Sequence, residues 1–205
     1  LEFLDDGADK ENLRIEIAEM EQIIATLLEA ERLNTRHAAL RRARISVRSL
    51  VDDLVDTYFD RDRDRIAVTL EDDSMVANVD DARLILLIKN LLSNALRYSD
   101  DAAGAVRLDI TMAGQDLVIE VKDRGPGFTK EQVSRIGEPF YRGDPSRTRD
   151  TGGSGLGLYL AKLVAEAHGG SLRLDRDYID GACLIASIPG QDTANECIDK
   201  IVTEP

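Results

Sequence analysis

Apolar residues recur at helical spacing near the start of the chain. They lie alternately four and three positions apart, at Leu13, Ile17, Met20, Ile24 and Leu27. This spacing predicts a helix over Glu11–Leu33 whose narrow apolar seam faces another helix. Ile23 and Leu28 widen the stripe, as in a helix of a bundle. We expect packing within a hairpin or between molecules; packing on its own domain is the alternative.

Shorter elements follow. Residues 34–44 are polar and basic and predict a linker or the end of the helix. The next segments are a strand at Ile45–Val47, a helix from Ser49 to about Phe59 with Asp52 near a capping-box position, and a solvated turn at Asp60–Arg65. After them come strands at Ile66–Leu70 and Met75–Val79 with a turn at Glu71–Ser74, and a very apolar helix from Asp80 or Asp81 to about Arg97.

The second half alternates between strand and loop patterns. Its predicted elements are a hairpin of Val106–Met112 and Leu117–Val121, a loop at Asp123–Phe128, a short helix at Thr129–Ile136, strands at Ser171–Leu174 and Ala182–Ile188, and a polar tail at Gln191–Pro205. Residues 143–154 contain no apolar side chain and predict a mobile loop or lid. Helices and strands mix without regular alternation, which predicts an α+β fold: one mixed sheet with helices on one face.

Composition narrows the possible functions. The chain has 205 residues, which suits one domain with a small appendage, and 43% hydrophobic residues, enough for a core. Its net charge of −13 argues against non-specific binding to nucleic acid or an anionic membrane. An anionic ligand therefore requires a local basic cluster. Cys183 lies in an apolar run and Cys197 in the polar tail, so no disulfide framework or zinc spacing is present.

A glycine-rich stretch runs into a helix at Thr151–Gly170. Glycines allow close approach of a ligand, and the free N–H groups of a first helical turn favour an anion. No Lys-Ser or Lys-Thr follows, so the stretch is not a P-loop. It predicts a phosphate-binding site, with a flexible turn as the alternative.

Polar residues also align on the apolar helix before residue 98. Asn90, Asn94 and Arg97 are spaced i, i+4 and i+7, and so share one face. Such groups are costly when buried without partners, so we expect them to face a polar cavity. Asparagine oxygen suits Mg²⁺, and Arg97 with Tyr98 suits phosphate. Capping of nearby backbone groups is the alternative.

Two further motifs carry possible ligand chemistry. Asp123 ends a strand before two glycines around a proline, and its carboxylate could accept a hydrogen bond from an adenine amine; a common turn is the alternative. In the segment Glu138–Arg142, Phe140 and Tyr141 are expected to anchor the base of the polar loop. Arg142 is then expected to contact a terminal phosphate. The alternative is a basic stretch that only faces solvent.

In this order and spacing, the motifs resemble those of sensor histidine kinases. The four segments are Asn90–Tyr98 for the N box, Asp123–Gly127 for the G1 box, Glu138–Arg142 for the F box and Gly153–Leu158 for the G2 box. The resemblance covers about residues 45–190. It extends less specifically to residues 1–40, which resemble the end of the dimerisation and phosphoacceptor hairpin with its second helix. Residues 191–205 form a tail outside it. Gly137 departs from the pattern, because many F boxes have a second Phe there; we expect looser lid packing and no effect on ligand chemistry.

The resemblance implies a Bergerat-type two-layer α/β sandwich that binds ATP and Mg²⁺. It implies Mg²⁺ coordination by Asn94, a catalytic role for Asn90 and Arg142, and adenine recognition by Asp123. Its ATP-binding positions correspond to Asn90, Asn94, Arg97, Tyr98, Asp123, Gly125, Gly127, Tyr141, Arg142, Gly153, Ser154, Gly155, Leu156 and Gly157.

The implied activity is phosphoryl transfer from ATP to a histidine of the dimerisation domain, and then to an aspartate of a response regulator. His37 lacks the acid and proline of the family's acceptor motif, and His168 ends a helix, where a cation suits the dipole. We therefore expect a piece of a kinase without its acceptor histidine.

The resemblance also implies a homodimer through the hairpin, a cytoplasmic location for this portion, no nucleic-acid partner and any inner-membrane anchor upstream. A gyrase-like or Hsp90-like ATPase and a non-catalytic nucleotide-binding module are the alternatives. Asn90 argues against the ATPase, because those relatives carry a Glu there to activate water and an amide is no general base.

Overall fold

A five-stranded mixed sheet forms the centre of the computed structural model, which describes residues 7–34, 40–99, 104–142 and 154–190. Its strand order is β2-β4-β5-β7-β6; β2 runs parallel to β4, and all other neighbours are antiparallel. The strands are β2 (Ile66–Leu70), β4 (Val106–Ala113), β5 (Asp116–Lys122), β6 (Ser171–Leu174) and β7 (Cys183–Pro189). The predicted hairpin is confirmed as β4 and β5.

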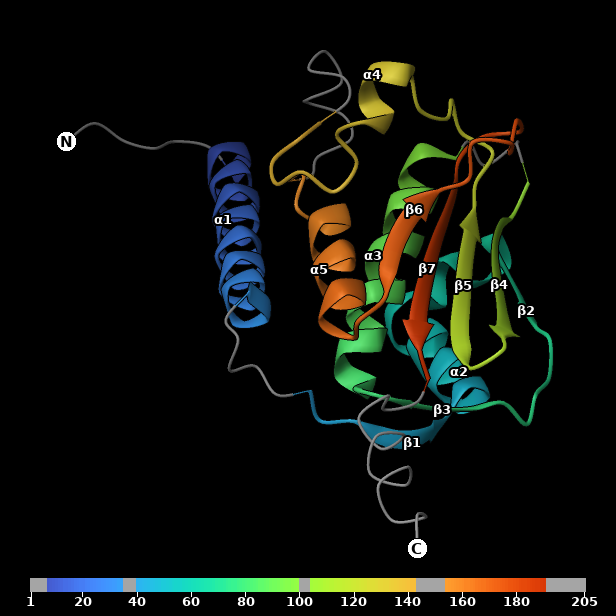
Figure 1. Cartoon of the computed structure of the whole chain (residues 1–205). Helices are drawn as coiled ribbons and strands as arrows, with labels where there is room; N and C mark the ends of the chain where they lie inside the picture. The colour runs from blue at the N-terminus through green and yellow to red at the C-terminus, as the bar shows by residue number, and fades with distance from the viewer. Residues whose placement is uncertain (1–6, 35–39, 100–103, 143–153, 191–205) are drawn as a thin grey trace, which may run out of the picture.

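Helices pack on one face of this sheet (Figure 1). The three longest of them after the N-terminal helix are α2 (Val47–Tyr58), α3 (Asp81–Tyr98) and α5 (Gly157–Ala167). Along β4, Leu108 and Ile110 are fully buried, whereas Arg107 before them and Thr111 after them are exposed. This alternation places one side of the sheet in the core and the other outside. The predicted α+β class and two-layer arrangement are therefore confirmed.

A separate two-stranded sheet lies below the helices, made of β1 (Ala43–Ser46) and β3 (Val76–Val79). The two strands are antiparallel, and Ile45 lies opposite Ala77. The strands predicted on either side of the turn at residues 71–74 thus belong to different sheets. Pairing with distant segments decides this, and no local pattern encodes it.

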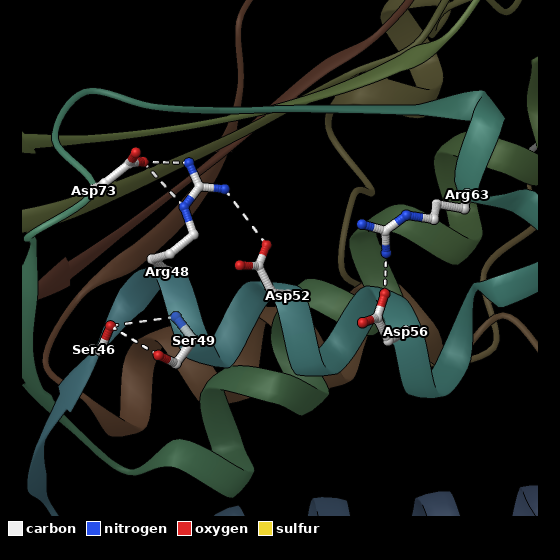
Figure 2. A network of polar contacts seen from close by, with 7 residues as sticks. All are labelled: Ser46, Arg48, Ser49, Asp52, Asp56, Arg63 and Asp73. Carbon is white, nitrogen blue, oxygen red and sulfur yellow. Dashed lines mark hydrogen bonds and ion pairs between the residues drawn. The ribbon is translucent and has the colours of Figure 1, made fainter.

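The first residue of α2 is one point where the sequence prediction was wrong. Ser46, not Ser49, is the N-cap, and its Oγ accepts the backbone N–H of Ser49 at 3.3 Å (Figure 2). Val47 is fully buried and already helical, so the helix begins where the apolar face begins. For α3, Asp80 is the N-cap, as one of the two predicted candidates.

Short elements complete the fold. Residues 60–65, predicted as a turn, form the 3₁₀-helix η1 (Asp60–Arg65). The helix predicted at 129–136 is only α4 (Lys130–Val133), with Thr129 and Gln132 forming a capping box at its start. Most of the predicted lid at 143–154 and the whole predicted tail at 191–205 lie outside the described residues.

The long N-terminal helix α1 (Gly7–Asn34) confirms the first predicted helix. Its C-terminal half packs on α5, where Ala30 contacts Leu160 and Leu163 in a small apolar cluster. The seam faces away from this contact and stays open; Ile17, Met20 and Ile24 are 47%, 60% and 54% exposed. One face of α1 therefore packs within the chain, and the seam has no partner among the described residues.

Candidate functional site

A cavity of about 570 Å³ lies beside the N-terminal end of α5. Its walls come from α3, the loop after β5, the segment after α4 and the residues leading into α5. The predicted site residues that line it are Asn90, Asn94, Arg97, Tyr98, Asp123, Gly127, Tyr141, Arg142, Ser154, Gly155 and Gly157. Four motifs that are far apart in sequence therefore meet in one concave site.

The polar face of α3 forms one wall of the cavity. Asn90, Asn94 and Arg97 all line it, as their spacing predicted. Asn90 Nδ2 donates to the backbone oxygen of Leu86 at 2.8 Å, which leaves its amide oxygen available. The side chains of Asn94 and Arg97 form no hydrogen bond or ion pair within the described part of the chain, and both line the cavity. These side chains thus present oxygens and a guanidinium to a ligand, and the capping alternative holds only for the amide nitrogen of Asn90.

Asp123 is buried at the end of β5, with only 4% of its surface exposed. Its Oδ1 accepts the backbone N–H groups of Gly125 and Ala182, both at 2.9 Å. Burial raises the pKa of this carboxyl, and the two N–H groups oppose that effect. Oδ2 receives no hydrogen bond from a described residue. Every buried side-chain nitrogen or oxygen among those residues has a partner, so Oδ2 is open to the cavity.

The glycines around Pro126 allow close contacts of the backbone. A Cβ on Gly125 would lie 2.5 Å from the carbonyl oxygen of Tyr98, at the end of α3. Gly127 has a φ of +69°, and a Cβ there would lie 2.8 Å from the carbonyl oxygen of Gly181. Gly127 lines the cavity, whereas Gly125 packs behind it. The G1 loop is thus held between α3 and the β6–β7 loop.

The start of α5 approaches α3 just as closely. A Cβ on Gly157 would lie 2.9 Å from Asn90 Oδ1, so a larger residue there would require the Asn90 side chain to shift. Leu156 is fully buried beneath the cavity and does not line it. Gly153, like Arg147 and Arg149 of the predicted lid, lies outside the described residues.

The F-box segment closes another side of the site. Tyr141 is half-buried, and the guanidinium of Arg135 stacks 3.9 Å from its ring centre. Phe140, which we expected to anchor the loop base, is 57% exposed and has a φ of +63°, so that expectation was wrong. Gly155 lies directly against the main chain of Phe140, where an added Cβ would be 2.9 Å from the Phe140 carbonyl carbon. Gly137, expected to have no part in ligand chemistry, lines the cavity.

The cavity is locally basic within an acidic chain. Lys89, Arg97, Arg135 and Arg142 line it, against two acidic residues, Asp123 and Glu138. Because the whole chain is acidic, we expected an anion-binding site to need a local basic cluster, and this cavity has one. Among the described residues, no three His, Cys, Asp or Glu side chains gather as a metal site. A cation here would depend on amide oxygens of α3 and on oxygens of the ligand.

Comparison with protein families identifies the domain. Residues 79–192 match the model of the histidine kinase-, DNA gyrase B- and HSP90-like ATPases. The match includes every lining residue except Thr26. The chain belongs to this family. The matched region is therefore a catalytic ATP-binding domain of the histidine kinase type, and it contains the cavity.

Curated relatives are sensor kinases. The chain is 33% identical over 181 residues to the sensor-like histidine kinase SenX3 of Mycolicibacterium smegmatis, covering 87% of this chain and 47% of the relative. It is 27% identical over 188 residues to the sensor histidine kinase WalK of Bacillus subtilis, covering 90% and 31%. The chain thus spans between about a third and a half of the length of these relatives. None of its described helices combines the length and apolar character needed to cross a bilayer.

Solved structures share the fold. The Acinetobacter baumannii histidine kinase AdeS superposes with a TM-score of 0.72 at 19% identity, covering 93% of this chain and 88% of that one. Full-length ShkA in complex with AMPPNP gives a TM-score of 0.73 at 21% identity, covering 92% and 40%. Both alignments extend beyond the residues matched by the family model.

Several residues that line the cavity were not predicted as site residues, and Lys89, Arg135 and Thr26 are three of them. Lys89 directly precedes Asn90, Arg135 follows the short helix α4, and Thr26 comes from α1. An anion site in an acidic chain needs basic side chains nearby. A search for basic residues next to each motif could therefore have identified Lys89 and Arg135. Thr26 could not be found, because only the packing of α1 on α5 brings it near.

Proposed function

We propose that this chain is the kinase portion of a two-component system and transfers the γ-phosphoryl group of ATP to a histidine. The supporting observation is one cavity that combines the amides of α3, an open carboxylate oxygen at Asp123 and Arg142. The phosphoryl group passes to a ring nitrogen of the acceptor histidine, and ADP leaves. A response-regulator aspartate then receives it.

Each residue has a role in this proposal. Asp123 Oδ2 accepts a hydrogen bond from the adenine amine, while Tyr98, Tyr141 and Ser154 line the nucleotide. Arg97 and Arg142 neutralise phosphate oxygens, and Arg142 also stabilises the transferring group. Gly153, Gly155 and Gly157 allow the backbone to reach the phosphates, with Gly125, Gly127 and Leu156 shaping the site around them.

Mg²⁺ fits the oxygen donors of α3. Asn94 is the proposed ligand, and the ion would neutralise charge on the phosphates and hold them in place. Asn90 lies one turn earlier with its oxygen toward α5, and we assign it a positioning role in catalysis. Positioning and charge neutralisation account for most catalysis of phosphoryl transfer, so no protein nucleophile is required.

The wider assembly is part of the proposal. Residues 1–40 contribute the second helix of a dimerisation hairpin, residues 41–190 form the kinase domain and residues 191–205 are a tail. The exposed seam of α1 supports helix-to-helix packing, because single exposed apolar residues are common but a regular row is not. A homodimer would bury this seam.

The experiment mixes the chain with Mg-ATP and a separately produced hairpin domain that bears the acceptor histidine. Acid-labile, base-stable label on that domain supports the kinase. Phosphate release without label would instead support the ATPase alternative, and nucleotide binding alone would support the non-catalytic nucleotide-binding module. Asn94→Ala is expected to lower labelling about 100-fold or more. Asn78→Ala, in β3 away from the cavity, is the matched control and should label normally.

A further inference from the structure

The loop between β6 and β7 passes directly behind Asp123. The backbone N–H of Asp123 donates to Ala182 O at 2.9 Å, and Ala182 N–H returns a bond to Asp123 Oδ1. A Cβ on Gly181 would lie 2.3 Å from the carbonyl oxygen of Asp123. The position of Asp123 thus depends on this loop as much as on β5.

Tyr178 makes the one side-chain contact from this loop to the Asp123 main chain among the described residues. Its hydroxyl donates to the carbonyl oxygen of Asp123 at 3.1 Å. Burial raises the pKa of Tyr178 above its usual 10.0, so the donor keeps its proton at neutral pH. The side chain does not line the cavity.

The rest of the loop supports this inward orientation of Tyr178. Asp175 N–H donates to Cys183 O at 2.8 Å and closes the loop at its base, and Asp177 N–H donates to the Asp175 side chain at 3.0 Å. The next residue along, Ile179, is 91% exposed. These two adjacent side chains therefore point to opposite sides, and of the two only Tyr178 reaches Asp123.

We propose that Tyr178 is a positioning residue for base recognition: its bond to the Asp123 carbonyl holds the Asp123 main chain in place, so that the carboxylate, held at Oδ1 by two N–H groups, directs Oδ2 toward an adenine base. This rests on the proposed adenine contact of Asp123. Adenine offers an amine to Oδ2, whereas guanine offers a carbonyl oxygen at that position, which a carboxylate repels. A carboxylate held in one direction discriminates between them; one free to rotate discriminates less.

The test is calorimetric titration of the full chain with ATP and with GTP. Tyr178→Phe removes only the hydroxyl, and we expect ATP affinity to fall about three- to tenfold, in line with loss of one hydrogen bond. The ratio of ATP to GTP affinity should fall with it, which simple loosening of the fold would not produce. Ile179→Ala is the matched control in the same loop and should leave both affinities unchanged.

Asp123→Asn separates the two proposals. If it leaves the ATP-to-GTP ratio unchanged, the adenine contact itself is wrong. If Asp123→Asn abolishes the preference but Tyr178→Phe retains the wild-type ratio, only the positioning role of Tyr178 is overturned. Circular dichroism of both variants confirms that each has folded.

Discussion

His168 at the end of α5 accepts a hydrogen bond at Nε2 from the backbone N–H of Asp80, at the start of α3, over 3.2 Å. Its Nδ1 lies 2.8 Å from the carbonyl oxygen of Val164, which can only accept. The two contacts together define a neutral ring protonated at Nδ1. The sequence suggested a cation at this helix end; the ring is instead 99% buried and neutral.

This arrangement predicts lower stability in mild acid. Burial is the main cause that lowers the pKa of His168 below 6.5, and the nearby Arg42 and Arg83 act in the same direction against Asp80 and Val164 O. In the unfolded chain the ring regains its usual pKa, so the unfolded state binds more protons between the two values. The contribution of His168 to the free energy of unfolding is therefore fully present above pH 6.5. It falls as the pH drops below that value, by at most about 1.4 kcal/mol per pH unit.

The measurement is urea unfolding between pH 7.5 and pH 5.5. His168→Gln should flatten the pH dependence while lowering stability at pH 7.5, because glutamine does not titrate. The chain has one other histidine, so His37→Gln is the control for general histidine titration. Equal slopes for wild type and His168→Gln would show that the buried ring does not carry the effect.

A second prediction concerns Glu29 of α1 and Arg83 of α3. Their side chains form an ion pair and are only 25% and 17% exposed. Partial burial reduces screening, so we expect a coupling energy of about 1 kcal/mol between helix α1 and the rest of the chain. The more exposed pair Arg63–Asp56, seen in Figure 2, should contribute less than about 0.5 kcal/mol.

Hydrogen exchange tests this coupling. Arg83→Gln should speed amide exchange in residues 25–33 about fivefold, the rate equivalent of 1 kcal/mol. Adding Glu29→Gln should cause little further increase, because the pair is already broken. Arg63→Gln is the control and should leave these amides unchanged. Protection of α1 that does not respond to Arg83→Gln would mean that apolar contacts alone hold the helix.

The sequence predicted the elements that local patterns encode. A period of 3.6 residues placed Asn90, Asn94 and Arg97 on one helical face, and the structure turns that face to the cavity. Alternation placed Leu108 and Ile110 in the core in the same way. In both cases the side chains of one segment carry all the information needed.

The misses depend on contacts between distant segments. The parallel pairing of Ile66 with Val106 joins residues 40 positions apart, and no local pattern specifies it. Phe140 looks like an anchor by residue type, but the backbone of Gly155 occupies the space beside it. Ser46 and Ser49 are equivalent as caps in sequence; the buried Val47 decides between them.

The third prediction concerns the thiol of Cys183, which the sequence placed in the core. The side chain is fully buried, and burial raises its pKa to about 11. Both effects suppress the reactive thiolate. In a Cys197→Ser variant, a thiol-reactive dye at pH 8 should therefore label almost no native protein and one thiol after denaturation in urea. If the native protein were labelled as fast as an exposed cysteine, without first unfolding, the thiol of Cys183 would not be buried.

The last prediction returns to the glycine-rich entry into α5. Gly155 has a φ of +70°, and a Cβ there would lie 2.9 Å from the carbonyl carbon of Phe140 and 3.0 Å from Tyr141 O. Main-chain atoms cannot move aside as a side-chain end can, so Gly155→Ala should push the F-box segment away from α5. We expect weaker ATP binding, by about tenfold, with the fold of the sheet retained.

Gly114 supplies the matched control. It has a φ of +67° in the β4–β5 turn, with nothing within 4 Å of an added Cβ. Gly114→Ala thus carries the same left-handed backbone cost, about 1–2 kcal/mol, without the collision. Gly155→Ala should lose at least as much stability in urea unfolding as Gly114→Ala, but only Gly155→Ala should lose ATP affinity in calorimetric titration. Equal ATP affinities would mean that backbone strain, and not contact with the F box, is what glycine avoids at position 155.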